Sequence, residues 1–226
     1  MKESVTGSAS SGHLALGFVP SASSTVLPKL IRQLKKEHPA LHIELREMIS
    51  SEQAEAVAAG HLDAGIARTK PHHPRLMVAA QMADPFCLAL TPREARRADS
   101  PVELRSFADH DFVAFTRHRG PAYFDQSIYL CAKAGFSPRI RYEASTVHGV
   151  LDLVGAGLGV ALVPSSCALL GVAGTSYRSL RRAGLGEFLV LLQRKADSNP
   201  ILPVLADAVR ANFVELTRRT TQTLVD

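Results

Sequence analysis

Small hydroxyl residues and arginines follow several predicted strands of this chain, at points where a helix is about to begin. The loop at 20–25 reads Pro-Ser-Ala-Ser-Ser-Thr, a run of hydroxyls with almost no bulk. Comparable loops lie at 49–52, 68–70, 116–123 and 145–146. Free backbone N–H groups and the macrodipole at a helix N-terminus favour a bound anion. The chemistry that these residue types suggest is therefore the binding of a small anion.

Two arginines in these loops, Arg68 and Arg117, add fixed positive charge that matches the geometry of a carboxylate. The alternative for any single residue is simpler: the serines cap helices and the arginines are solvated. Because several such loops fall at one predicted sheet edge, we favour a binding site over a set of unrelated caps.

The first third of the chain alternates between strands and helices. Residues 13–19 and 41–47 read as strands, and apolar residues recur at helical spacing over 26–34. Ser50 and Ser51 offer an N-cap for a helix that Gly60 would end. With a short buried strand at 62–67, this order predicts right-handed crossovers and a mostly parallel sheet.

A second alternating block follows. We expect strands at 111–116, 139–144 and 159–163, with helices at about 123–134 and 146–155 between them. The remaining predicted elements are two strands within 76–90 on either side of Asp84-Pro85, a capping box with a helix start at Ser100-Pro101-Val102-Glu103, a strand at 187–193 and a final helix opened by Pro200. Two blocks of this kind predict two lobes, with ligands at the carboxyl ends of the strands.

The composition limits the function classes. Hydrophobic residues make up 46% of the 226 residues and charged residues 21%, as in ordinary soluble proteins. No apolar run approaches the roughly 18 residues of a membrane span, and 1–11 lacks the apolar core of a secretory signal, so we expect a flexible lead-in. The net charge of +5 permits an anionic ligand. Cys87, Cys131 and Cys167 are interpreted as buried free thiols of a cytoplasmic protein.

Motifs of catalysis and of metal binding are missing. We find no Gly-x-Ser-x-Gly elbow, no phosphate-binding loop and no pair of carboxylates suited to general acid and base work. The glycines at 155–159 follow a helix and lead into a strand, the reverse of a dinucleotide site, and His72-His73 lacks a third metal ligand. Asp63 is interpreted as a structural carboxylate that accepts from nearby backbone N–H groups. We therefore predict no enzyme, no cofactor and no metal.

Three stretches carry a resemblance to a known family. HPALHIELREMISSEQAEAVAAGHLDAGIAR at 38–68, LVGAGLGVALVP at 153–164 and GHLALGFVPS at 12–21 together resemble the effector-binding domain of LysR-type transcriptional regulators. The family pattern there is His-Pro, an alternating strand, a small polar turn, a helix and then Gly-x-Leu-Asp-x-x-Ile. The resemblance covers roughly residues 12–217. The nearest subgroup resembles the regulators of aromatic-compound degradation, which carry similar "GF-V", "EM" and "DAG-x-x-R" stretches.

The resemblance implies an α/β fold of the type 2 periplasmic-binding-protein-like class, in which two crossover strands join two Rossmann-like lobes. It also implies a small anionic effector, usually a carboxylate and in this subgroup often aromatic, in the cleft between the lobes. The implied boundaries are a lead-in at 1–11, lobe I at 12–84 plus 189–226, lobe II at 85–188, and crossover strands near 84–90 and 185–190.

The motifs and loops together give one set of candidate ligand-binding residues: Ser21, Ser50, Ser51, Arg68, Thr116, Arg117, Tyr123 and Thr146. The sequence departs from the family at Ile49, which replaces a small residue, and at Ala122, where a polar residue is common. The loop TRHRGPAY at 116–123 is also unusually basic. These departures leave the identity of the effector open.

The family carries a winged helix-turn-helix and a linker helix ahead of this domain. Neither precedes residue 12, so we expect the sensor part of a regulator that forms dimers and tetramers and contacts promoter DNA only through the missing segment. A solute-binding protein of a transport system with the same fold is the main alternative, and it would need an export signal or lipobox. A small α/β enzyme is the third possibility, and it would need an essential carboxylate or histidine in the cleft.

Overall fold

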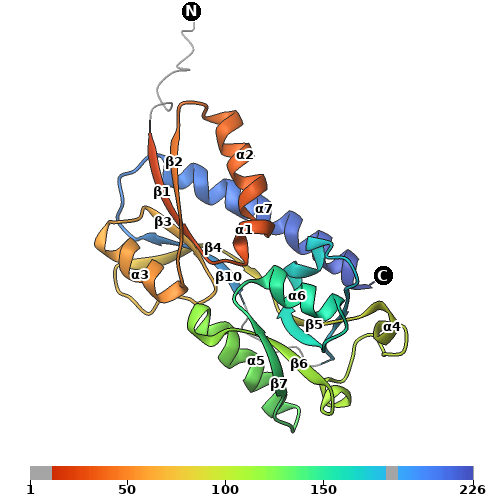
Figure 1. Cartoon of the computed structure of the whole chain (residues 1–226). Coiled ribbons are helices and arrows are strands. Elements are labelled where there is room, and N and C mark those ends of the chain that lie inside the picture. Colours follow the sequence, from red (N-terminus) through yellow and green to blue (C-terminus); the bar gives the residue numbers. More distant parts are fainter. Residues whose placement is uncertain (1–11, 182–187, 226) are drawn as a thin grey trace, which may run out of the picture. The chain divides into compact units, whose positions relative to one another are not determined.

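The computed structural model describes residues 12–181 and 188–225, which form two compact units (Figure 1). The first unit ends at Gln81 and resumes over Leu189–Val214, whereas the second begins at Met82, ends at Phe188 and resumes at Glu215. The predicted lead-in at 1–11 and residues 185–187 of the predicted crossover at 185–190 lie outside the described residues.

The first unit contains one five-stranded sheet in the order β2-β1-β3-β10-β4. Strand β1 pairs in parallel with β2 and β3, which confirms the parallel arrangement predicted for the first three strands, whereas β10 runs antiparallel to β3. Its elements are β1 (His13–Phe18), α1 (Ala22–Thr25), α2 (Leu27–Glu37), β2 (His42–Glu47), α3 (Ser50–Ala59), β3 (Ala64–Ala67), β4 (Leu76–Ala83), β10 (Phe188–Arg194) and the first part of α7 (Ile201–Val225).

The periodicity of the sequence accounts for these elements. Leu30 and Leu34 recur at helical spacing on α2 and are completely buried, while Leu14 and Leu16 alternate along β1 and are buried with them. Helix α3 ends at Gly60, whose φ of 82° lies in the left-handed region that a residue without Cβ adopts at little cost.

The second unit has a fully buried strand at its centre. Strand β5 pairs with β8 and β9 on either side, and alternate residues of β5 enter two hydrophobic clusters, Leu88 in one and Cys87 in the other. The elements of this unit are β5 (Phe86–Leu90), α4 (Pro92–Ala95), η1 (Leu104–Phe107), β6 (Asp111–Phe115), η2 (Arg117–Arg119), α5 (Pro121–Lys133), β7 (Arg139–Ala144), α6 (Val147–Gly155), β8 (Ala161–Pro164), η3 (Ser165–Leu170) and β9 (Ser176–Ser179).

The parallel pair β6 and β7 completes the second unit. A single parallel bridge between Phe112 and Val160 links β6 to the chain just before β8. Gly159 passes so close to β6 that a Cβ there would lie 2.4 Å from the carbonyl oxygen of Asp111. The glycines at 155–159 therefore form a helix end and tight turn, as predicted.

The unit boundaries differ from the predicted lobe boundaries. The chain leaves the first unit inside β4, a few residues before the predicted position, and it crosses again inside α7. Residues from Glu215 onward group with the second unit, where Leu224 packs against the cluster that contains Val150. The resemblance implies that lobe I, at 12–84 plus 189–226, keeps the whole of this helix.

One predicted helix start is wrong. No helix begins at 100–103, because the backbone N–H of Val102 donates to the carbonyl oxygen of Ser179 at 2.8 Å and so pairs this segment with β9. The capping box lies earlier, at α4: the Thr91 side chain accepts from the Glu94 N–H, and the Glu94 carboxylate accepts from the Thr91 N–H at 2.9 Å.

Asp63 holds the start of β3 against β1. Its Oδ2 accepts the backbone N–H of Ala15 at 2.7 Å. Arg194 on β10 lies 3.7 Å from the same carboxylate and donates to the carbonyl oxygen of Val57 at 2.8 Å. The interpretation of Asp63 as a structural carboxylate is therefore confirmed.

Replacing Asp63 by Ala should lower the free energy of unfolding by about 2 kcal/mol, because a charge-assisted hydrogen bond is lost and the buried N–H of Ala15 is left without an acceptor. Urea unfolding followed by circular dichroism measures this loss. Asp207→Ala is the matched control, since it removes an exposed carboxylate on α7 that pairs with Arg210. Equal losses in the two variants would contradict the assignment.

The three cysteines, Cys87, Cys131 and Cys167, are buried and form no disulfide, as predicted. Burial raises the pKa of the Cys131 thiol to about 12 and that of Cys87 well above its ordinary value.

None of the helices in the described part of the chain is long and apolar enough to cross a membrane.

Because the thiolate is the reactive form, we expect no thiol of the folded chain to react with Ellman's reagent at pH 8 and every thiol to react in urea. The raised pKa of Cys131 also stabilises the fold below the unfolded value of 9.0, and this contribution should be lost as the pH rises from there toward about 12. Rapid reaction of the native protein at pH 8 would contradict the burial.

Candidate functional site

Arg68 joins the ends of three strands in the first unit. Its Nε–H donates to Ser21 Oγ at 2.8 Å, and its backbone N–H donates to Ser50 Oγ at 3.1 Å. Ser21 follows β1, Ser50 follows β2 and Arg68 follows β3. The structure therefore brings together three of the predicted residues, which we call the Arg68 cluster.

The parallel register of the strands explains this meeting. Phe18, near the end of β1, lies opposite Glu47 on β2 and Ile66 on β3. The backbone continues this pairing past the strands, because Met48 N–H donates to the Phe18 carbonyl at 3.0 Å and Val19 N–H donates to the Ile66 carbonyl at 3.0 Å. The loops that leave the three strands are consequently held side by side.

The hydroxyls of the loop at 20–25 divide between two roles. Ser23 Oγ donates to the Pro20 carbonyl at 2.7 Å, and Thr25 Oγ1 donates to the Ser21 carbonyl at 2.8 Å. These bonds fix the loop on itself. Ser21 makes no side-chain cap to α1, and its hydroxyl instead accepts from Arg68.

The predicted N-cap role of Ser50 and Ser51 is wrong. The N-cap of α3 is Ile49, in an extended conformation and without a side-chain cap, so Ser50 is already the first helical residue. The Ser50 hydroxyl is occupied by the N–H of Arg68. Ser51 is exposed, and no hydrogen bond joins it to the Arg68 cluster within the described residues.

Two predicted threonines of the second unit also follow neighbouring parallel strands. The N–H of Thr116, after β6, donates to the carbonyl oxygen of Ala144 at the end of β7, at 3.0 Å. Thr146 caps α6, since its Oγ1 accepts the Gly149 N–H at 3.0 Å. The Thr116 hydroxyl is buried and has no hydrogen-bond partner among the described residues. It is thus a polar group whose bonding capacity is unused by the described chain.

Arg117 forms an ion pair with a carboxylate of its own unit. Its Nε lies 2.7 Å from Asp125 Oδ1 and its Nη2 lies 2.9 Å from Oδ2, a bidentate pair between two exposed side chains. The hydrogen bonds from Arg117 hold the pKa of Asp125 below its ordinary value. The positive charge of Arg117, which we expect from the sequence to contact an anionic ligand, is therefore compensated by Asp125 in this structure.

Tyr123 is held by the core of the second unit. Its hydroxyl donates to the Leu162 carbonyl oxygen at 2.7 Å. Its ring stacks on Phe86, with centroids 5.2 Å apart, and is tilted against Phe115 at 5.1 Å. These contacts give Tyr123 a packing role, and the ligand contact that the family motif implies stays a prediction.

The sequence reasoning passed over Gln53, which lies beside the Arg68 cluster. Its side chain on α3 is completely buried, and its Nε2 donates to the Met48 carbonyl at 2.9 Å. The available signal was its position four residues before Val57, which places a polar side chain on the buried face of the helix.

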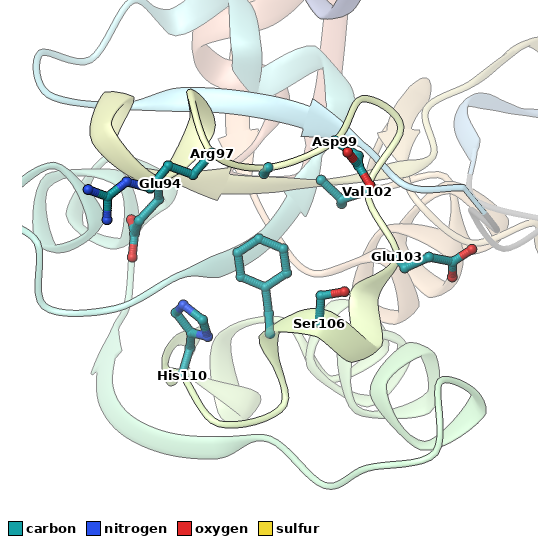
Figure 2. A pocket seen from close by; sticks show the side chains of 9 residues that line it. Glu94, Arg97, Asp99, Val102, Glu103, Ser106 and His110 are labelled. Carbon is teal, nitrogen blue, oxygen red and sulfur yellow. The ribbon is translucent and has the colours of Figure 1, made fainter.

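A separate pocket of about 340 Å³ lies in the second unit, between α4 and η1 (Figure 2). His110, which lines it, directly precedes β6, so this pocket lies at the opposite end of that strand from Thr116. Carboxylates outnumber guanidinium groups among its charged side chains, which makes it a poor receptor for an anion. These charged residues are Glu94, Arg97, Asp99 and Glu103. Over residues 12–181 and 188–225, no group of three or more His, Cys, Asp or Glu side chains is arranged to hold a metal ion.

Comparison with known proteins places these features in a family. The sequence profile described as "LysR substrate binding domain" matches residues 7–214. The HTH-type transcriptional regulator AlsR of Bacillus subtilis is 32% identical over 84% of this chain and 63% of its own length. CatR of Pseudomonas putida, also an HTH-type transcriptional regulator, is 32% identical over 84% of this chain and 65% of its own length. The chain thus spans less than two thirds of these relatives.

A solved structure of the BenM effector-binding domain with its effector benzoate has the same fold. The TM-score is 0.78 at 24% sequence identity, and the match covers 92% of this chain and 94% of that one. The predicted α/β fold of the type 2 periplasmic-binding-protein-like class is confirmed.

Replacing Tyr123 by Phe should lower the free energy of unfolding by about 1 kcal/mol, because the Leu162 carbonyl loses a hydrogen-bond donor while the ring stacking is kept. Chemical denaturation measures the change. Tyr129→Phe, on the exposed face of the same helix, is the control and should leave stability unchanged. A Tyr123→Phe variant as stable as wild type would argue against a packing role for the hydroxyl.

Proposed function

Because this chain belongs to the LysR substrate-binding domain family, we propose that it is the sensor domain of a transcriptional regulator and that it binds a small organic carboxylate. The relatives that it matches are transcriptional regulators and not enzymes. The observation that supports a carboxylate is the Arg68 cluster at the ends of three parallel strands.

The hydrogen bonds inside the cluster leave it with donors. Ser21 Oγ and Ser50 Oγ each accept an N–H from Arg68. A hydroxyl that accepts one bond still has its own proton to donate. Two hydroxyl protons, one of them on the serine that accepts from the guanidinium group, suit a carboxylate, which only accepts.

The second unit supplies the further contacts of this proposal. We assign to the ligand the Thr116 hydroxyl, which has no hydrogen-bond partner among the described residues, and the strand-end Thr146, as the family resemblance predicts. Arg117 would have to exchange Asp125 for the ligand, so we give it a smaller role than Arg68. Benzoate, the effector of BenM, makes aromatic carboxylates the first class to test.

The action of the whole protein is part of the same proposal. A ligand that binds one arrangement of the lobes more tightly shifts the equilibrium toward it. In a full-length cytoplasmic regulator, this shift would alter the dimer or tetramer and so the segment that reads DNA. The regulators among the relatives favour this role over that of a transport solute-binding protein.

A thermal-shift panel of aromatic and aliphatic carboxylates tests the ligand class, with the amide of each acid as its uncharged control. A carboxylate present at a hundred times its Kd should add about 2.7 kcal/mol to stability, whereas the amide should add little. Benzoate and benzamide form the first pair. Equal shifts from acid and amide, or none from any acid, would contradict carboxylate sensing.

Replacing Arg68 by Ala should weaken binding of the best carboxylate tenfold or more, since a hydrogen bond to a charged group contributes about 1.5–3 kcal/mol. Isothermal titration calorimetry on the folded variant measures the affinity, with folding checked by circular dichroism. Arg32→Ala removes an exposed arginine of the same unit, on α2, and should leave affinity unchanged. Unaltered affinity in the Arg68 variant would remove this residue from the site.

A further inference from the structure

We propose that Gln53 is a positioning residue for the Arg68 cluster, because its side-chain amide fixes the turn that carries Ser50. Its effect on ligand affinity rests on the proposed function. Its effect on the geometry of the cluster does not, and can be measured without a ligand.

The amide of Gln53 holds the turn between β2 and α3. Its Nε2 donates to the Met48 carbonyl at 2.9 Å, and its backbone N–H donates to the Ile49 carbonyl at 3.0 Å. On the other side of the turn, the N–H of Met48 donates to the Phe18 carbonyl at 3.0 Å. The segment directly before Ser50 is therefore hydrogen-bonded both to α3 and to β1.

The same side chain lies against the other two strands of the cluster. A Cβ at Gly65 on β3 would lie 2.6 Å from Gln53 Oε1, and a Cβ at Gly17 on β1 would lie 3.1 Å from Gln53 Cγ. A Cβ at Gly65 would therefore force the Gln53 amide to shift, and a Cβ at Gly17 would press on Gln53 and, more closely, on Leu62. Gly17 is four residues before Ser21, and Gly65 is three residues before Arg68. Gln53 therefore lies against β1 and β3 close to the residues of the Arg68 cluster that follow these strands.

Packing alone does not account for an amide at this position. Gln53 is completely buried, and its Oε1 has no hydrogen-bond partner among the described residues. A buried acceptor without a partner is destabilising, and an apolar side chain of the same length would avoid that penalty. What an apolar side chain cannot replace is the N–H that reaches the Met48 carbonyl.

Loss of the Gln53 Nε2–H donor should speed hydrogen exchange of the Arg68 backbone amide. The Arg68 N–H is bound to Ser50 Oγ, so a looser turn at 48–50 exposes that N–H to solvent more often. Hydrogen exchange of the Arg68 amide, followed by NMR on the ligand-free chain, therefore reports the position of Ser50.

The first variant is Gln53→Met, which keeps the length of the side chain and removes the donor. Exchange of the Arg68 amide should become about fivefold faster or more, as in Ser50→Ala, which removes the acceptor directly. Amides of α2, in the same unit, should exchange at the wild-type rate. Wild-type exchange at Arg68 in the Gln53→Met variant would overturn the proposal.

The second test separates positioning from support of the core. Gly65→Ala should lower the melting temperature, because its Cβ meets Gln53 Oε1. The double variant Gln53→Ala with Gly65→Ala relieves that clash and should recover part of the melting temperature. Its Arg68 amide should still exchange as fast as in the Gln53→Met variant. If protection at Arg68 recovers together with the melting temperature, Gln53 is only a core residue and the proposal fails.

The affinity readout is independent of these results. In the Gln53→Met variant, the carboxylate with the largest thermal shift, with benzoate as the first probe, should bind about threefold more weakly or worse. If the wild-type chain binds no carboxylate, the proposed function fails and the exchange experiment still decides the role of Gln53. If wild type and variant bind equally well, the positioning role does not extend to the ligand.

Discussion

Three parallel strands of the first unit end in register, and this constraint determines what the unit can bind. Phe18, Glu47 and Ile66 lie opposite one another on β1, β2 and β3, so the residues that follow them must share one edge. At this edge, Arg68 donates a hydrogen bond from its side chain to the Ser21 hydroxyl and another from its backbone N–H to the Ser50 hydroxyl. In the proposed function, an arginine held through both its side chain and its backbone loses little freedom when a carboxylate binds, which favours affinity.

The second unit repeats the design with an arginine that is already paired. Two parallel strands, β6 and β7, deliver loops to its corresponding edge. The arginine that follows β6 is paired with Asp125, and the aromatic ring of Tyr123 belongs to the core. Hydroxyls at the strand ends remain, with Thr116 unpaired among the described residues. In the proposed function the first unit therefore supplies the charge and the second supplies neutral donors.

The sequence was sufficient for the long elements and for the residues that parallel strands bring together. It predicted the alternation of strands and helices, because buried residues recur with clear periods, and it placed Ser21, Ser50 and Arg68 at one edge. It missed the short β9 and misread 100–103, because the pairing between Val102 and Ser179 joins residues far apart in the chain. Side-chain partners were equally hidden: neither the Arg117–Asp125 pair nor the bond from Gln53 to Met48 follows from any local pattern.

The most direct measurement is an NMR titration of the Arg68 side-chain Nε–Hε resonance with benzoate, or with the strongest carboxylate of the panel, and with the matching amide. If the carboxylate binds at the Arg68 cluster, this resonance should move along one saturating curve whose midpoint equals the calorimetric Kd, and the amide should leave it in place. A carboxylate that binds with measurable heat while the Arg68 resonance stays fixed would show that the anion is held elsewhere.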